Sequence, residues 1–136
     1  MNALVLDASV ALAFCLEDER DSFTREQLAQ LEQAAIVVPP HWWAEVCNGL
    51  LMVEKRKRIK QGEQSQCISL LNELLPSPLE VSATEWDEDI FPLARSHQLT
   101  IYDACYLYLA LRENYPLLTF DKALRKAARA EQVDVL

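Results

Sequence analysis

Glycine is scarce in this chain of 136 residues: there are only two, Gly49 and Gly62, and they lie far apart. Phosphate-binding loops need several closely spaced glycines, because the backbone must approach the phosphate. The sequence therefore excludes a dinucleotide-binding loop of the Rossmann type and a P-loop, and with them nucleotide chemistry of those two kinds.

The four cysteines, Cys15, Cys47, Cys67 and Cys105, form no CxxC pair, and the two histidines complete no zinc-binding spacing. Each cysteine lies in an apolar stretch, which predicts a small buried side chain rather than a metal ligand or a nucleophile. The sequence thus gives no support for a zinc site or a reactive thiol.

Long apolar runs and a basic leader are also missing. The apolar run at the start of the chain stops at Asp7, and no other run approaches the roughly 18 residues that cross a membrane. We therefore expect no signal peptide and no membrane contact, and a soluble protein located in the cytoplasm.

Acidic residues outnumber basic ones by 21 to 13, which gives a net charge of −8. This balance argues against a protein that coats nucleic acid non-specifically, because phosphates repel it. Basic residues nevertheless gather in the run 55–60 (KRKRIK) and between residues 122 and 129. The first run fits a positive rim for RNA phosphates, or equally an exposed helix end whose cations suit the helix dipole.

Short apolar runs alternate with helical periodicities along the chain. Such runs are typical of strands that are buried on both faces. The predicted strands are 36–38, 79–81, 117–120, 133–135 and 3–6, and the predicted helices are 10–16, 22–34, 41–58, 63–75, 84–97, 103–114 and 122–130. Pro92 predicts a kink, or two helices that meet near Phe91. The alternation predicts one α/β domain over residues 1–136, with a parallel sheet that helices cover on both faces.

Four carboxylates lie just after predicted strands or near the starts of predicted helices. Asp7 and Asp121 directly follow predicted strands, Asp103 opens a helix, and Glu45 lies one turn into the helix after the second strand. Ligands of open α/β sheets bind beyond the carboxyl ends of the strands, so these acids are expected to meet there. Clustered carboxylates need a cation, and oxygen ligands suit Mg²⁺ or Mn²⁺. Such an ion can hold a phosphodiester and activate water.

Each of these acids also has a simpler explanation. Aspartate is a favoured N-cap residue, and Asp7, Asp103 and Asp121 each precede a predicted helix. Glu45 is explained equally well as a solvated helix residue. The pattern alone leaves both explanations open.

Four segments in order carry a resemblance to a known family: residues 5–9 (VLDAS), 39–48 (PPHWWAEVCN), 99–110 (LTIYDACYLYLA) and 118–124 (LTFDKAL). With them the chain resembles a PIN-domain ribonuclease, specifically a VapC-type toxin of type II toxin–antitoxin pairs, over nearly its whole length. The resemblance implies a three-layer α/β/α sandwich with a mostly parallel sheet. It also implies an endoribonuclease that hydrolyses RNA phosphodiesters with Mg²⁺ or Mn²⁺ as cofactor.

The resemblance further implies that Asp7, Glu45, Asp103 and Asp121 are the catalytic and metal-binding carboxylates. Asp7 and Asp103 are expected to be the main ligands, and the other two to bind directly or through water.

Three further residues are expected to support these acids. Thr119 is expected to donate a hydrogen bond to a carboxylate or a metal-bound water, and Ser9 either orients Asp7 or caps the first helix. Asn48 lies three residues from Glu45, hence on the same helix face, and either holds Glu45 or is a plain surface residue.

The partners that the resemblance implies are RNA, a cognate antitoxin that wraps hydrophobic grooves, and a second copy of the chain. Trp42 and Trp43 bear on this, because adjacent helical residues point about 100° apart. Either one is in the core and the other is available to a partner, or both are buried against different elements.

Other classes of α/β protein are weighed against this hypothesis. A catalytically silent PIN module that serves as an RNA- or protein-binding scaffold is less favoured, because all four acids are present. An Mg²⁺-dependent phosphoacceptor domain needs a pair of acids after the first strand, where Asp7 stands alone. A haloacid-dehalogenase-like phosphatase needs an acid at position 9, which is Ser9.

Overall fold

The computed structural model describes residues 2–136 and places a four-stranded parallel sheet at the centre of the chain. The strands lie in the order β3-β2-β1-β4, so β1 pairs with β2 on one side and with β4 on the other. Their bounds are Ala3–Leu6 for β1, Ala35–Val38 for β2, Ser77–Pro78 for β3 and Leu117–Leu118 for β4.

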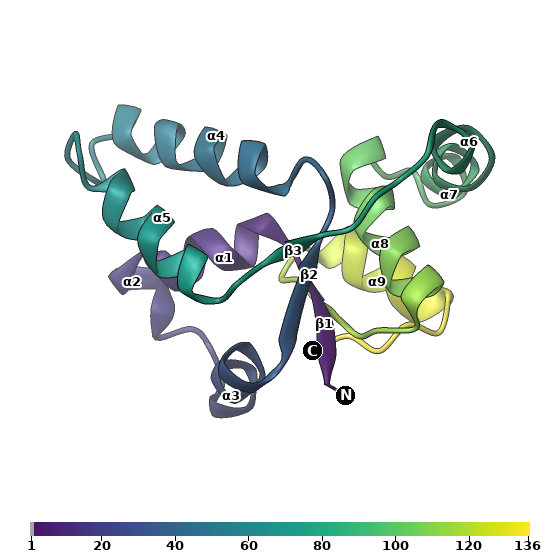
Figure 1. The fold of residues 1–136 in the computed structure, drawn as a ribbon, viewed down its shortest axis with the longest axis horizontal. Coiled ribbons are helices and arrows are strands. Elements are labelled where there is room, and N and C mark those ends of the chain that lie inside the picture. The colour runs from purple at the N-terminus through teal and green to yellow at the C-terminus, as the bar shows by residue number, and fades with distance from the viewer. Residues whose placement is uncertain (1) are drawn as a thin grey trace.

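Helices cover both faces of this sheet, which confirms the predicted α/β/α sandwich (Figure 1). On one side lie α1 (Ala8–Cys15), α2 (Glu17–Arg20), α3 (Arg25–Gln33), α4 (Trp42–Lys55) and α5 (Gln64–Glu73). On the other lie α6 (Ala83–Glu85), the π-helix η1 (Trp86–Ile90), α7 (Phe91–His97), α8 (Ile101–Glu113) and α9 (Lys122–Ala130).

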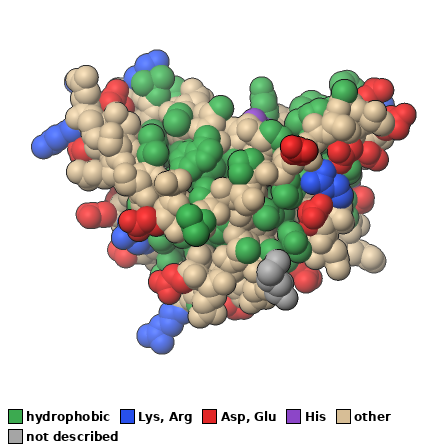
Figure 2. Space-filling view, in the orientation of Figure 1, with side chains coloured by type: hydrophobic (Ala, Val, Ile, Leu, Met, Phe, Trp, Pro, Cys, Tyr) green, Lys and Arg blue, Asp and Glu red, His purple; other side chains and the backbone are tan. Residues whose placement is uncertain are grey.

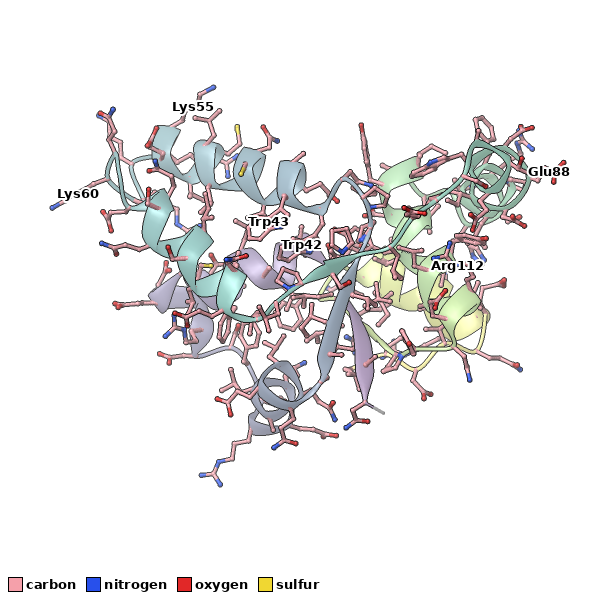
Figure 3. The ribbon with its side chains drawn as sticks, in the orientation of Figure 1. Trp42, Trp43, Lys55, Lys60, Glu88 and Arg112 are labelled. Atoms are coloured by element: carbon pink, nitrogen blue, oxygen red, sulfur yellow. The ribbon has the colours of Figure 1, made fainter. Side chains whose placement is uncertain are left out.

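The first strand is the centre of the core. All four of its residues are buried, because helices pack on both faces of the sheet. Trp42 is fully buried beside it, and its indole N–H donates a 2.9 Å hydrogen bond to the carbonyl of Leu6. Trp43 is half-buried and packs edge-on against Trp42, with ring centroids 4.9 Å apart, so one of the two tryptophans is in the core and the other reaches the surface (Figure 3).

Three predicted strands are wrong in extent, and the one expected at 117–120 shortens to Leu117–Leu118. The strand expected at 79–81 is displaced to Ser77–Pro78, which pairs with the end of β2, and only the N–H of Leu79 still bonds to the sheet. A proline is tolerated there because β3 is an edge strand. The strand expected at 133–135 reduces to a single bridge between Leu117 and Val135.

Most helix boundaries differ from the prediction by one to three residues, and the prediction lacks the short helix α2. Two differences bear on the site. The helix expected at 103–114 begins at Ile101, because Thr100 is its N-cap, so Asp103 is not a cap. The stretch expected as one helix at 84–97 is continuous but passes from a π-helix to an α-helix at Phe91. Pro92 falls in the first turn of α7, where the missing N–H costs least, which agrees with the predicted junction near Phe91.

The expectation that all four cysteines are buried is wrong for Cys47, which is exposed on α4. Cys67 and Cys105 are buried as predicted, and burial raises the pKa of the Cys105 thiol to about 12. Cys15 is half-buried, and its thiol donates to the carbonyl of Cys67.

The two ends of the molecule differ in charge. Lysine and arginine side chains project near the turn between α4 and α5, and acidic side chains of α6 and η1 gather at the other end (Figure 2). Figure 3 shows Lys55 and Lys60 at the first end and Glu88 at the other. Within residues 2–136, no helix combines the length and the apolar character that a membrane crossing requires.

We predict that Trp42→Phe lowers the free energy of unfolding by about 2–3 kcal/mol, because it removes core volume and leaves the Leu6 carbonyl without its donor. Trp43→Phe is the matched control and is expected to cost less than about 1 kcal/mol, since Trp43 is only half-buried. Urea unfolding of both variants measures the difference, and equal losses would contradict the assignment of Trp42 to the core.

Candidate active site

The strand order reverses between β1 and β4. After β1, the chain forms β2 on one side of β1. It forms β4, on the other side of β1, only after α8. The carboxyl ends of β1 and β4 are therefore the point where the strand order reverses, the usual place for a ligand in an open α/β sheet. Asp7 directly follows β1 there, and Thr119 directly follows β4.

Asp7 is 5% exposed, and polar donors surround its carboxylate. The hydroxyls of Thr119 and Ser9 donate to Oδ2 at 2.7 and 2.9 Å, and the backbone N–H of Ser9 donates to Oδ1 at 3.3 Å. Burial nevertheless raises the pKa of Asp7 above its ordinary value. Asp7 is thus the N-cap of α1, and Ser9 orients it.

Thr119 connects Asp7 to the next acid along the chain. Its fully buried hydroxyl donates to Asp7 and accepts the backbone N–H of Asp121 at 3.1 Å. The carboxylate of Asp121 caps α9 through Oδ1, which accepts the N–H of Leu124 at 2.8 Å. The guanidinium of Arg125, a residue without a predicted role, donates to the Thr119 carbonyl at 2.7 Å and to the Leu136 carbonyl at 2.9 Å. Arg125 thereby ties the end of the chain to this corner.

Asp103 lies in the first turn of α8, and its backbone N–H donates to the Thr100 hydroxyl at 3.1 Å. Its carboxylate is half-buried. Burial, followed by repulsion from Asp7, Asp121 and Glu45, raises the pKa of Asp103 to about 6. The fold therefore brings all four sequence-predicted carboxylates close enough together to act on one another.

Glu45, in the first turn of α4, is held by residues for which the sequence analysis gave no role. Its Oε1 accepts a 2.8 Å hydrogen bond from the hydroxyl of Tyr106, whose oxygen accepts the N–H of Ala8 at 3.1 Å. His41 Nε2 lies 3.0 Å from the same Oε1, but this contact lacks the alignment of a hydrogen bond. Asn48 is exposed, Tyr106 holds Glu45 by a hydrogen bond, and His41 is in close contact with it.

Sequence spacing contains a signal for both of these partners. Tyr106 is three residues after Asp103, and His41 is four before Glu45, so each shares a helix face with a candidate acid. Which faces of α4 and α8 meet, however, depends on how the two helices are packed in the fold. That packing is not visible in either spacing.

The donor set suits a hard divalent cation. Four carboxylates repel one another at the end of the sheet, and oxygen ligands favour Mg²⁺ or Mn²⁺. As the side chains stand, no three His, Cys, Asp or Glu residues among residues 2–136 are arranged to hold one ion. The chemistry of the site therefore fits such an ion, and coordination by three or more carboxylates requires side-chain rotation.

Comparison with known proteins places this site in context. The model of the PIN domain matches residues 4–130. The chain is 31% identical over 121 residues to Ribonuclease VapC3 of Pyrobaculum aerophilum, an alignment that covers 89% of this chain and 91% of that protein.

Solved structures share the fold. The crystal structure of PAE2754 from Pyrobaculum aerophilum matches with a TM-score of 0.71 at 22% identity, over 98% of this chain and 90% of that one. VapBC2 from Rickettsia felis, solved with a DNA fragment from the promoter, matches with a TM-score of 0.62 at 19% identity, over 98% and 97% of the two chains.

We predict that Asp103→Asn raises the melting temperature of the metal-free protein at pH 7 by about 2–5 °C, roughly 1 kcal/mol once screening of a half-buried side chain is allowed for. The folded pKa of about 6 exceeds the unfolded value of about 3.9. The wild type therefore loses stability at this residue as the pH rises from about 4 to above 6.

Melting curves between pH 4 and pH 8 in the presence of a chelator measure this effect. The gain should fall to a small fraction of its pH 7 value at pH 4, where Asp103 is protonated in the folded wild type and about half protonated in the unfolded chain. Asp134→Asn, at an exposed position, is the control. A gain of equal size at pH 4 and pH 7 would mean that charge repulsion is not its cause.

Proposed function

The chain belongs to the PIN-domain family, and on this basis we propose that it is a metal-dependent endoribonuclease that hydrolyses RNA phosphodiesters as the toxin of a toxin–antitoxin pair. The observation that carries the proposal is the convergence of four acids at the reversal point of the sheet, where burial and then repulsion from Asp7, Asp121 and Glu45 raise the pKa of Asp103. Such an arrangement costs stability without a cation and gains from one. The proposed location is the cytoplasm, where RNA substrates are found.

We assign the main metal contacts to Asp7 and Asp103, with Glu45 and Asp121 binding directly or through water. A bound Mg²⁺ or Mn²⁺ ion would supply positive charge for the phosphate and lower the pKa of an attacking water. The protein contributes orientation: the hydroxyls of Ser9 and Thr119 fix Asp7, and the start of α9 fixes Asp121. With Thr119 fully buried, this part of the site has little freedom to move.

The RNA path is proposed to run past the start of α9, where exposed Lys122 directly follows Asp121. The basic run 55–60 is less suited to this role. It lies at the end of α4 away from Glu45, and within it Arg58 pairs with Asp18 and Glu19, each at 2.9 Å. Its cations are better explained by the carboxyl end of α4, whose dipole they complement.

We predict that Asp7→Asn reduces RNA cleavage at least about 100-fold while the fold is kept, because the amide retains the shape but loses the charge that binds an ion. Cleavage by the wild type should stop with a chelator and return with Mn²⁺ or Mg²⁺. The assay maps cleaved sites in total RNA for the wild type, Asp7→Asn and the exposed control Glu88→Gln.

The result also separates the proposal from its alternatives. A silent scaffold predicts no Mn²⁺ binding in calorimetry and no cut sites that differ between the wild type and Asp7→Asn. Wild-type cleavage by Asp7→Asn would overturn the assignment of the site. A phosphoacceptor domain would instead form an acid-labile phosphate ester on Asp7.

We propose that the groove between α4 and α5 receives an apolar segment of the antitoxin, with an acidic residue at one end. The groove measures about 430 Å³ and is lined by Leu50, Leu51, Ile68, Cys47 and polar residues from both helices. Hydrophobic side chains gather there in Figure 2, and lysines project at its far end in Figure 3. Glu54 is the one charged residue among those that line the groove, so charge complementarity favours an acidic residue only at the end of the segment that reaches the lysines. A homodimer stays a prediction from the family resemblance.

We predict that Leu51→Asp weakens the complex with the antitoxin encoded beside this protein at least about 10-fold, because it places a charge in the apolar groove. RNA cleavage by the free protein should be unchanged. Leu75→Asp is the control, since Leu75 is 80% exposed and is not among the residues that line the groove. Titration calorimetry measures both affinities, and equal affinity of the two variants would place the partner elsewhere.

A further inference from the structure

Tyr106 is fully buried in α8, and its hydroxyl joins two elements that are far from it in sequence. The oxygen accepts the N–H of Ala8, the first residue of α1, at 3.1 Å. The proton is donated to Glu45 Oε1 on α4 at 2.8 Å. One hydroxyl thus bridges the helix that follows Asp7 and the helix that carries Glu45.

The two bonds are not equivalent in what they accomplish. The N–H at the start of a helix has no partner within the helix, so the bond from Ala8 satisfies a buried backbone group. The bond to Glu45 acts on a half-buried carboxylate that is near enough to Asp7 and Asp103 to raise their pKa values. With Oε1 occupied by Tyr106 and in contact with His41, Oε2 is the oxygen of Glu45 left for an ion or its water.

We propose that Tyr106 is a positioning residue of the metal site, which holds the Glu45 carboxylate at a fixed place relative to Asp7. This inference rests on the proposed function, which supplies the metal ion that Glu45 would bind. It assigns to Tyr106 no contact with substrate. Residues that hydrogen-bond a metal-ligating carboxylate hold it in place, and their mutation typically lowers metal affinity 10–100-fold.

The test is Tyr106→Phe, which removes the hydroxyl and keeps the ring. Mn²⁺ affinity, measured by calorimetry, should fall about 10–100-fold. RNA cleavage should fall with it at limiting Mn²⁺ and recover at saturating Mn²⁺. Tyr108→Phe is the matched control, because Tyr108 lies on the same helix and donates its hydroxyl to Glu85 instead. It should change Mn²⁺ affinity less than about 2-fold.

A second pair of variants separates positioning from a purely structural effect. In a Glu45→Gln background, Tyr106→Phe should lower Mn²⁺ affinity no further, since the carboxylate through which it acts is gone. An equal loss in both backgrounds would place the effect at Ala8 and overturn the proposal. Glu45→Asp leaves the core untouched and keeps the negative charge, but its shorter side chain no longer reaches the Tyr106 hydroxyl. This variant should show the same loss of Mn²⁺ affinity even if Tyr106→Phe does not fold. Wild-type affinity in Glu45→Asp would equally overturn it.

Failure of this inference is distinguishable from failure of the proposed function. If the wild type binds Mn²⁺ but cleaves no RNA, the proposed function is wrong, and the affinities still decide the role of Tyr106. If Tyr106→Phe binds Mn²⁺ as the wild type does while RNA is cleaved, only the role of Tyr106 is wrong.

Discussion

Repulsion among carboxylates at the carboxyl end of β1 is the constraint on which the rest of the site depends. Asp7 is almost fully buried, and burial, followed by repulsion from Asp7, Asp121 and Glu45, raises the pKa of Asp103 to about 6. A fold tolerates such a cluster only if hydrogen-bond donors or a cation offset the charge. The hydroxyls of Thr119 and Ser9 supply part of this at Asp7, and Tyr106 supplies it at Glu45.

Helix capping and membership of the acidic cluster turn out to be compatible. Asp7 and Asp121 each cap a helix, as the simpler explanation of their positions required, and both belong to the cluster. Asp121 accepts the cap bond on Oδ1, which leaves its second oxygen for other partners. A capping bond fixes the direction of a carboxylate, so it prepares the group for a ligand rather than competing with one. Asp103 differs, because Thr100 performs the capping of α8.

Local sequence was enough to predict most of the fold and the proximity of the four acids at one end of the sheet. Uniformly apolar runs such as residues 3–6 have one stable place, inside a covered parallel sheet, and the acids that follow such runs are then located by topology. What could not be predicted depends on packing between distant elements. The displaced edge strand at Ser77–Pro78, the π-helix at Trp86–Ile90 and the bridge through Tyr106 all arise from contacts across the molecule. In sequence, the spacing of Tyr106 from Asp103 indicates a shared helix face, but it does not show that Tyr106 reaches Glu45 on another helix.

Helix α4 carries Glu45 in its first turn and lines the groove further along. Different elements pack against these two parts of the helix. Glu45 is held by Tyr106 on α8 and contacts His41, which precedes α4, whereas the groove is formed against α5. The turn between α4 and α5 lies at the opposite end of the helix from Glu45 (Figure 1). In the described part of the chain, the Glu45 carboxylate bonds to Tyr106 and not to a residue that lines the groove. The groove proposed for a partner and the acids proposed for the metal therefore have separate supports, although one helix carries both.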